Sequence, residues 1–359
     1  MRLKIGVVGV GHLGQHHARI LAGMPEVELV GVVDANGEQA KSIAAQLGTR
    51  VFTDHHELAG QVDAACVVVP TTWHFTVAGE FLSRGLPVLV EKPIALNLNE
   101  ANRLVELSHK HSAMLQVGHI ERFNPAYEEL RRRPIRPKFI ECERHGTFTG
   151  RSTDIGAVLD LMIHDLDLLL DLVGGPVVEV SAVGATVFGG HEDLANARLR
   201  FASGCIAHVT ASRMSPNPKR KLRVWAPEGY AGIDYKSRRL TLVQPSDELR
   251  HRGTGLTEVD PSHRPVLQDQ MFTRYLQTLN LDCDRGDQLT SELEHFVDCV
   301  RTHSRPRVGG EEGRDALALA ARVLESMHKH RWENRDGGPT GPDELPKPSG
   351  WLFGVNDAA

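Results

Sequence analysis

Three glycines and one aspartate near the N-terminus have the types and spacing of a turn that binds phosphate and ribose. Gly9, Gly11 and Gly14 follow the pattern G-x-G-x-x-G. The first glycine permits a tight turn, the second lets a pyrophosphate approach the backbone, and the third lets helix and strand pack closely. Asp34 stands 34 − 14 = 20 residues after the last glycine, where a carboxylate can accept hydrogen bonds from ribose hydroxyls. The pattern predicts dinucleotide binding, with an ordinary strand-to-helix turn as the alternative.

Lys92 follows a short apolar run and is the second residue of Glu91-Lys92-Pro93. An ammonium group at the end of a buried strand can donate a hydrogen bond to a substrate hydroxyl and stabilise negative charge that develops on its oxygen. The alternative is a solvated lysine in a loop.

Asp160 and His164 stand four residues apart in an otherwise apolar stretch, and Asp167 follows on nearly the same stripe. A spacing of four places two side chains on one face of a helix. A histidine and an acid on an apolar helix need partners or face a cavity. The alternative is a buried histidine with its hydrogen bonds satisfied; a metal site lacks a third ligand at a recognisable spacing, so no metal is expected.

The elements that must position these residues alternate between strands and helices. An apolar run at Leu3–Val8 precedes the glycine turn, and a helix at Leu13–Ala22 leads to a second run, Val27–Val33, that ends at Asp34. This alternation continues to residue 117 and predicts a doubly wound parallel sheet. The further strands are expected at Arg50–Phe52, Ala64–Val69, Pro87–Val90 and Met114–Val117, and the helices at Gln39–Leu47, His55–Gly60, Phe75–Arg84 and Leu98–His111.

Ligands of such a sheet bind at the carboxyl ends of its strands, with phosphate at the start of the first helix. Coenzyme contacts are therefore expected from the three glycines, Asp34, and His12, Leu13, Pro70, His74, Glu91 and Lys92. The two residues after Asp34 are alanine and asparagine, so no arginine stands there to receive a 2′-phosphate. This predicts NAD rather than NADP.

The second half of the chain has a different pattern, with short strands and few long helices between them. Strands are expected at Lys138–Arg144, Val177–Val187, Ala197–Phe201, Cys205–Ser212, Leu222–Trp225, Gly232–Tyr235 and Leu240–Val243, and helices at Ile155–Val173, Gln268–Leu279, Ser291–His303 and Glu311–Trp332. The lack of crossover helices predicts a mostly antiparallel sheet. We place the domains at residues 1–122 and 123–334, followed by a Pro/Gly-rich tail at 335–359 in which Trp351, Leu352 and Phe353 are docking candidates.

The composition is that of a soluble globular protein, with 359 residues, 41% of them apolar and 24% charged. The net charge of −5 gives no basic field for nucleic acid, and the six-residue apolar run at Ala64–Val69 is too short to span a bilayer. The N-terminus lacks the regions of a signal peptide. The five cysteines form no C-x-x-C pair, which indicates reduced thiols and a cytoplasmic setting.

The junction between the halves, Gly118-His119-Ile-Glu-Arg122-Phe-Asn-Pro125, completes a familiar set. Together with the glycine turn, Asp34, Glu91-Lys92-Pro93 and the Asp160–His164 pair, it resembles the Gfo/Idh/MocA family of oxidoreductases over roughly residues 1–333. The alternative for the junction is a hinge whose Glu121 and Arg122 form surface ion pairs.

The resemblance implies a Rossmann domain followed by an α/β domain with a large, open, mostly antiparallel sheet, and a dimer or tetramer formed through that sheet. It implies NAD or NADP as coenzyme, a cis Lys92–Pro93 bond, and a substrate site lined by Lys92, Asp160 and His164.

The expected substrate is a sugar, a nucleotide sugar or a cyclic polyol, with His119 and Arg122 as further contacts. The junction is most similar to members that act on nucleotide sugars, and the basic Lys219 and Arg220, expected in a loop, are candidates to meet a diphosphate. In the expected reaction His164 removes the hydroxyl proton, Lys92 stabilises the alkoxide, and Asp160 positions the sugar or the lysine. An NAD-dependent glycosidase that oxidises its sugar transiently, and a non-catalytic dinucleotide-binding protein, are the alternatives.

Overall fold

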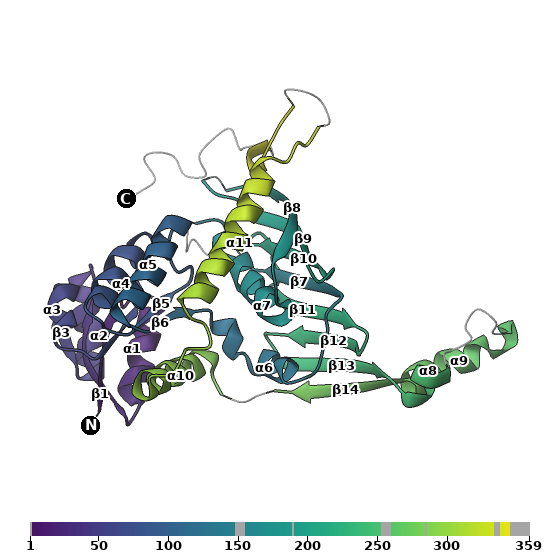
Figure 1. The fold of residues 1–359 in the computed structure, drawn as a ribbon, viewed down its shortest axis with the longest axis horizontal. Coiled ribbons are helices and arrows are strands. Elements are labelled where there is room, and N and C mark those ends of the chain that lie inside the picture. The colour runs from purple at the N-terminus through teal and green to yellow at the C-terminus, as the bar shows by residue number, and fades with distance from the viewer. Residues whose placement is uncertain are drawn as a thin grey trace. The chain divides into compact units, whose positions relative to one another are not determined.

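The computed structural model describes residues 2–147, 155–188, 190–252, 260–283, 286–333 and 338–344. The chain folds into two compact units. The first unit contains Met1–Arg133 and Asp282–Ala318, and the second contains Pro134–Leu281 and Leu319–Ala359. Each unit is built around one β-sheet (Figure 1).

The sheet of the first unit has six strands in the order β3-β2-β1-β4-β5-β6. All of its pairings are parallel, which confirms the predicted doubly wound sheet. The strands are β1 Leu3–Val8, β2 Val27–Val33, β3 Arg50–Phe52, β4 Ala64–Val67, β5 Val88–Glu91 and β6 Leu115–Gly118. Continuous apolar runs form them because helices cover both faces of a parallel sheet.

Each predicted helix of the first unit begins within two residues of its expected start, except α10, which begins three residues earlier than expected. They are α1 Gly14–Gly23, α2 Gly37–Leu47, α3 His55–Ala59, α4 His74–Ser83, α5 Leu98–His111, α10 Gln288–Thr302 and α11 Gly310–His328, of which α11 continues into the second unit. Two 3₁₀ helices, η1 Thr71–Trp73 and η2 Ile120–Phe123, and the short α6 Pro125–Arg131 were not predicted.

The stretch Asp282–Ala318 lies in the first unit, whereas the sequence-based boundaries place it in the domain at 123–334. The physical reason is the apolar face of α10. Leu293, Phe296 and Val297 of that helix share one buried core cluster with Ile5 of β1 and Leu21 of α1. Gln116 of β6 also pairs with Gly309 in an isolated bridge, just before α11.

The second unit contains an eight-stranded sheet in the order β14-β13-β12-β11-β7-β10-β9-β8. Strands β7 and β10 pair in parallel, while the pairings from β7 through β11 and β12 to β13, and from β10 through β9 to β8, are antiparallel. This confirms the expected mostly antiparallel sheet. The strands are β7 Phe139–His145, β8 Val177–Ala185, β9 Leu194–Phe201, β10 Ile206–Ser212, β11 Lys219–Ala226, β12 Gly229–Asp234, β13 Arg239–Pro245 and β14 Leu276–Asp282.

One face of this sheet is buried and the other is open. In β9 the buried Ala195, Ala197 and Leu199 alternate with the exposed Arg198 and Arg200, as the period of two requires. The π-helix η3 Val158–Met162 and the helix α7 Ile163–Val173 lie against the buried face. The C-terminal part of α11 packs beside β8, where the Ala182 N–H donates to Ser326 Oγ at 2.9 Å.

The helix predicted at Gln268–Leu279 is wrong for its last four residues, from Leu276 onward. Helix α9 ends at Gln270, the π-helix η6 covers Met271–Tyr275, and β14 begins at Leu276. Leucines at 276, 279 and 281 fit a helix almost as well as a strand, and sheet pairing with β13 decides between them. Strands β13 and β14 extend from the sheet and carry α8 Asp247–Arg252 and α9 Arg264–Gln270 at their far end (Figure 1).

Three further expectations concern the C-terminal tail, membrane-spanning helices and the cysteines. The tail predicted at 335–359 is described only at 338–344, where η7 Pro342–Glu344 forms, and the docking candidates Trp351, Leu352 and Phe353 lie outside the described residues. Within the described ranges, the helices are too short or too polar to cross a membrane. The five cysteines, all of which are described, form no disulfide.

Candidate active site

The three glycines of the turn have different surroundings. Gly9 has a φ of +87°, and a Cβ atom there would lie 2.4 Å from the Val68 carbonyl oxygen. A Cβ atom on Gly14 would lie 1.8 Å from the carbonyl oxygen of Gly9. Gly11 differs from both, because a Cβ atom on it would meet nothing within 4 Å. Two glycines therefore close the turn, and the space beside the third is open to a ligand.

Helix α1 begins directly after this turn. Leu13 is its N-cap residue, and no described side chain caps the helix start. The Gln15 N–H donates to the Gly11 carbonyl oxygen at 3.1 Å and the His16 N–H to that of Leu13 at 2.9 Å, and the positive end of the helix dipole at this start attracts an anion. His12 and Leu13 are exposed beside it. The residues of the turn therefore fit a pyrophosphate, as the sequence predicts.

Asp34 is held rigidly at the end of β2. Its Oδ2 accepts a hydrogen bond from the Val10 N–H at 2.7 Å, and its Oδ1 accepts one from the Asn36 N–H at 2.8 Å. Gln39, a residue that the sequence pattern did not point to, donates from Nε2 to the Val10 carbonyl oxygen at 3.1 Å. Each carboxylate oxygen has a second lone-pair site, so Asp34 can accept from ribose hydroxyls while it keeps these bonds.

His74 was expected to contact the coenzyme, and its ring is 1% exposed. Nδ1 lies 2.7 Å from the Pro93 carbonyl oxygen and Nε2 lies 2.9 Å from that of Val69. Burial lowers the pKa of His74, and the bonds to these two carbonyls oppose the effect. The ring thus joins the loop after β4, where Pro70 stands, to the loop after β5. Direct coenzyme contact by Pro70 and His74 stays a prediction.

Glu91 and Lys92 follow β5 at the carboxyl edge of the sheet. The Lys92–Pro93 bond is cis, as expected. Glu91 Oε1 lies 3.0 Å from Nε2 of the buried His17, and Glu91 Oε2 accepts from the Lys92 N–H at 3.2 Å. Burial raises the pKa of Glu91, but the hydrogen bond with His17 and the charges of His17 and Lys92 outweigh it, so the pKa lies below its usual value. The anionic Glu91 therefore accepts from His17 and fixes the backbone of Lys92.

A second buried acid, Glu292 of α10, lies near Glu91 and was not predicted as a site residue from the sequence. Its side chain is 0% exposed, and neither carboxyl oxygen has a hydrogen-bond partner among the described residues. Burial, and then the charge of Glu91, raise the pKa of Glu292 well above its usual value. The sequence did contain a signal that Glu292 is buried, because Glu292 stands in phase with Leu289 and Phe296 on the apolar face of α10.

The junction residues are buried rather than solvated. His119, Glu121 and Arg122 are 1%, 4% and 5% exposed, so the alternative of surface ion pairs is wrong. Arg307, which precedes α11, donates to the Arg122 carbonyl oxygen at 3.0 Å and to Glu128. The junction is therefore a fixed part of the first unit's core.

In the second unit, Asp160 and His164 are half-buried, while most of their neighbours on η3 and α7 are buried. The segment that carries Asp160 is a turn of π-helix, a feature that is frequent at functional sites. Asp167, on the same predicted stripe, is buried. Asp160 and His164 are therefore partly accessible on a segment that is otherwise mostly buried.

Residue 165 anchors the helix directly beside His164. Both carboxylate oxygens of Asp165 accept from Arg144 of β7, from Nε and Nη2, each at 2.9 Å. The two side chains are 2% and 3% exposed, and the Arg144 guanidinium also lies 5.7 Å from the centre of the Tyr235 ring. Bidentate pairs of this kind have a fixed geometry. Arg144 stands in phase with the buried Ile140 and Cys142, which is the signal that could have found it.

The start of η3 is fixed by a second buried group. Glu192 accepts from the Val158 N–H at 2.9 Å, and a Cβ atom on Gly156 would lie 2.1 Å from the Glu192 carboxylate. Arg213 donates to the Ile155 carbonyl oxygen at 3.1 Å. Residues 148–154, just before this segment, lie outside the described residues.

Lys219 and Arg220 were expected in a loop, and this expectation is wrong. They lie on strand β11, and the Lys219 ammonium is paired with Glu143 at 2.7 Å. The strand forms because alternate residues, Leu222 and Val224, are buried. Of the basic groups proposed to meet a diphosphate, Lys219 therefore already has a carboxylate partner.

Comparison with known proteins identifies the family of the chain. Residues 3–119 match the oxidoreductase family with an NAD-binding Rossmann fold, which defines the class of protein. Residues 118–231 match the GFO/IDH/MocA C-terminal domain. The chain belongs to the Gfo/Idh/MocA family of NAD-dependent oxidoreductases.

Several relatives extend over almost the whole chain. The UDP-N-acetylglucosamine 3-dehydrogenase of Acidithiobacillus ferrooxidans is 35% identical over 324 residues, which are 90% of this chain and 96% of that protein. Its solved structure superposes with a TM-score of 0.80 at 33% identity and covers 91% of this chain. The inositol 2-dehydrogenase of Rhizobium meliloti is 27% identical over 92% of this chain and 98% of that protein.

Proposed function

We propose that this protein is an NAD-dependent dehydrogenase that oxidises a secondary alcohol of a nucleotide sugar, with an activity like that of UDP-N-acetylglucosamine 3-dehydrogenase. A free sugar or a cyclic polyol is the wider substrate class. The observation that carries the proposal is the half-buried pair Asp160 and His164, on a helix that a buried Arg144–Asp165 pair anchors. The 35% identity to the Acidithiobacillus enzyme supports the particular substrate.

The residues of the first unit bind and orient the coenzyme in this proposal. The open space at Gly11 and the uncapped start of α1 receive the pyrophosphate, and Asp34 receives the ribose. His12, Leu13, Pro70, His74 and Glu91 complete the coenzyme contacts. Bound NAD supplies the acceptor for the hydride that leaves the substrate carbon.

The proton chemistry belongs to three side chains. An imidazole nitrogen of His164 removes the proton from the substrate hydroxyl, and histidine suits this role near neutral pH. The Lys92 ammonium donates a hydrogen bond to the same oxygen and stabilises the alkoxide as it forms. Asp160 positions the sugar or the lysine. The hydroxyl proton thus ends on His164, and the carbon-bound hydrogen leaves as hydride.

The junction contributes the remaining substrate contacts. We assign His119 and Arg122 to the substrate, and the Arg122 guanidinium suits the diphosphate of a nucleotide sugar. The first domain is thus the coenzyme-binding part, and the second carries substrate binding and oligomerisation. A cytoplasmic setting, in which the five thiols stay reduced, completes the proposal.

The test is a panel of nucleotide sugars, free sugars and inositols, followed by NADH absorbance. UDP-N-acetylglucosamine is expected to give the highest kcat/KM. His164→Ala is expected to lower turnover by roughly 10²–10⁴-fold with NAD affinity nearly unchanged, and Lys92→Ala is expected to slow turnover as well.

The matched control is His109→Ala, because His109 is an exposed histidine already paired with Glu311 at 2.8 Å. A His164→Ala enzyme with the turnover of the wild type would remove the assignment of the base. Product formation without net NADH would instead indicate the transient oxidation of an NAD-dependent glycosidase.

A further inference from the structure

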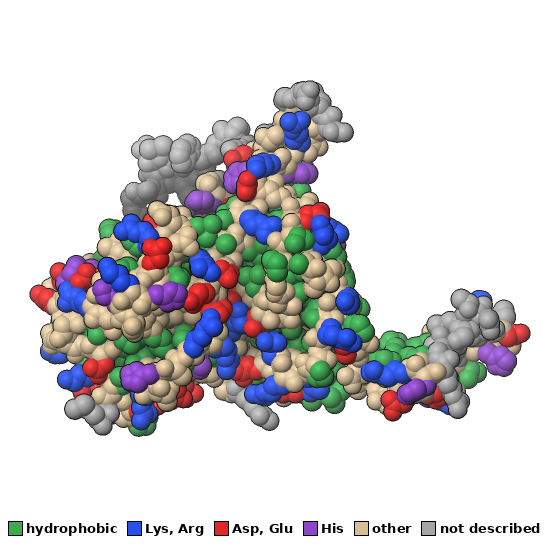
Figure 2. Space-filling view, in the orientation of Figure 1, with side chains coloured by type: hydrophobic (Ala, Val, Ile, Leu, Met, Phe, Trp, Pro, Cys, Tyr) green, Lys and Arg blue, Asp and Glu red, His purple; other side chains and the backbone are tan. Residues whose placement is uncertain are grey.

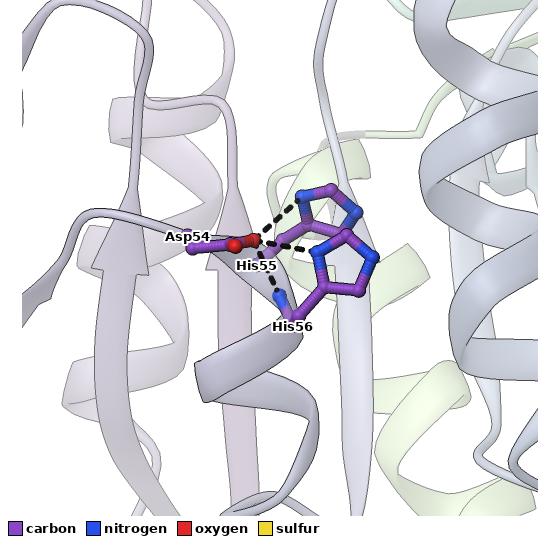
Figure 3. A group of neighbouring side chains, drawn as sticks. All are labelled: Asp54, His55 and His56. Carbon is purple, nitrogen blue, oxygen red and sulfur yellow. Dashed lines mark hydrogen bonds and ion pairs between the residues drawn. The ribbon is translucent and has the colours of Figure 1, made fainter.

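Three consecutive residues after β3 point ligand atoms at one place. Asp54 is the N-cap residue of α3, and His55 and His56 are the first two residues of that helix. Figure 3 shows both imidazole rings on the same side of the turn, with one nitrogen of each directed at the Asp54 carboxylate. This cluster has no part in the function proposed above.

The distances within the cluster are close to those of ligands on one metal ion. Asp54 Oδ1 lies 2.6 Å from His56 Nδ1 and 3.5 Å from His55 Nδ1, and the three ligand atoms all lie within 4.8 Å of one another. A tetrahedral ion with ligands at about 2.1 Å separates neighbouring ligand atoms by about 3.4 Å. The Asp54–His55 distance differs from that separation by about 0.1 Å and the Asp54–His56 distance by about 0.8 Å.

A carboxylate stands behind one of the two rings. Glu80 Oε2 of α4 lies 3.9 Å from His56 Nε2, and the other Glu80 oxygen is held by Arg84 at 2.6 Å. A histidine that binds metal through one ring nitrogen commonly donates its other N–H to a carboxylate. The distance of 3.9 Å is longer than a hydrogen bond, so Glu80 would accept from His56 Nε2 only after the ring moves closer, while Arg84 holds Glu80 in place.

The ordinary role of Asp54 is to cap α3, where Oδ1 accepts from the His56 N–H at 2.9 Å. This role does not compete with metal binding, because a carboxylate has about four lone-pair sites on its two oxygens. Only the proton now shared between His56 Nδ1 and Asp54 Oδ1, at 2.6 Å, must be displaced.

We propose that Asp54, His55 and His56 bind one transition-metal dication, with water molecules as the remaining ligands. Two imidazoles and one carboxylate favour Zn²⁺, Ni²⁺ or Cu²⁺ over the oxygen-seeking Mg²⁺ and Ca²⁺. The site is built within the first unit and is an additional site to the three-residue set Lys92, Asp160 and His164.

The test is calorimetric titration of the chain, without a histidine tag, with ZnCl₂ and separately with MgCl₂. One Zn²⁺ per chain is expected, and no heat of binding from Mg²⁺. Asp54→Asn retains an N-cap oxygen and His56→Gln alters a half-exposed ring, so both variants are expected to fold and to bind Zn²⁺ more than tenfold more weakly. Glu80→Gln is expected to weaken binding about tenfold, because it removes the outer carboxylate.

The matched control is His109→Gln, an exposed histidine with a single carboxylate partner, which is expected to bind Zn²⁺ as the wild type does. The His12–His16 pair, with ring centres 5.8 Å apart, is the competing site, and His16→Gln identifies it. Loss of the Zn²⁺ signal in His16→Gln, or equal binding by wild type, Asp54→Asn and His56→Gln, would overturn the proposal.

Discussion

Among single residues, Glu292 gives the clearest expectation for stability. Burial and the charge of Glu91 raise the pKa of Glu292 in the folded state, while its pKa in the unfolded chain is about 4.3. Between these two values the folded state binds one more proton, so stability falls as pH rises, by roughly 1.4 kcal/mol per pH unit. Glu292→Gln removes that dependence. We expect its melting temperature to exceed that of the wild type at pH 7–8 and the difference to shrink toward pH 5.

The control for this series is Glu294→Gln, which changes an exposed acid two residues further along the same helix. It is expected to follow the wild-type profile, measured by differential scanning calorimetry at several pH values. A Glu292→Gln protein whose melting temperature is lower than that of the wild type at pH 8 would show that the charged form is the stable one.

Asp34 is the residue that we assign to the ribose of the coenzyme. Removal of a charged acceptor costs about 1.5–3 kcal/mol, so Asp34→Ala is expected to weaken NAD binding by about tenfold or more and to narrow the preference over NADP. Fluorescence titration with both coenzymes measures this.

Asp63→Ala is the control, because Asp63 also accepts a backbone N–H, that of Lys4, but lies before a strand of the same sheet rather than after one. Equal NAD affinity in Asp34→Ala and wild type would contradict the assignment.

The sequence identified those residues whose role is local. Gly9 and Gly14 could be assigned from spacing alone, because the constraint on each comes from a neighbour within one turn or from the adjacent strand. Arg144 and Asp165 pair across 21 residues, and the spacing of neither residue encodes the other. The buried phase of Arg144 on β7 nevertheless marks it as a residue that needs a partner.

At the scale of elements, a substitution in the glycine turn can test coenzyme binding without disturbing the fold. Because a Cβ atom on Gly11 meets nothing within 4 Å, Gly11→Val is expected to fold normally and to fill the space that the pyrophosphate needs. NAD binding is then expected to be lost, with little change in melting temperature. Gly23→Val, at the other end of α1, also meets nothing within 4 Å and is the control for any cost in the helix.

If Gly11→Val binds NAD with the affinity of the wild type, the pyrophosphate does not occupy this turn. Gly14→Val is unsuitable for the same test, because its Cβ would collide with the Gly9 carbonyl oxygen and disturb the fold itself.

Helices and strands of the parallel sheet could be predicted because length and periodicity agree there. Helix α5 has the predicted bounds, with Asn97 as a side-chain N-cap and Ala101, Leu104 and Val105 on its buried face. The segment at 276–282 could not be predicted, since its pattern fits both states and pairing with a distant strand decides. The π-turn at Val158–Met162 adds one residue to a helical turn, which a spacing of four cannot reveal.

At the scale of the whole molecule, the sequence did not predict that Asp282–Ala318 belongs to the first unit. The helical pattern of α10 was predicted, but an apolar helix face does not indicate which part of the protein it packs against. Only the structure shows that α10 packs in the core around Ile5 and Leu21. Domain boundaries drawn from a change of pattern along the chain assume that each domain is continuous in sequence.

The open face of the second sheet leads to the last prediction, which concerns assembly. Trp225 of β11 is 36% exposed and forms an aromatic group with Phe139 and Tyr230, at ring distances of 5.2 and 5.3 Å. Leu279 of β14 is 47% exposed, and hydrophobic side chains are visible along the extension of β13 and β14 (Figure 2). A second copy of the chain would cover such a face, since apolar surface gains from burial.

We therefore expect a dimer or tetramer of the 39.5 kDa chain by light scattering coupled to gel filtration. Trp225→Asp and Leu279→Asp place a charge on the covered surface and are each expected to lower the measured mass toward that of one chain. Trp73→Asp is the control, because Trp73 is 58% exposed in the other unit and is expected to leave the mass unchanged. A wild-type protein that elutes as a single chain at micromolar concentration would refute the assembly through this face.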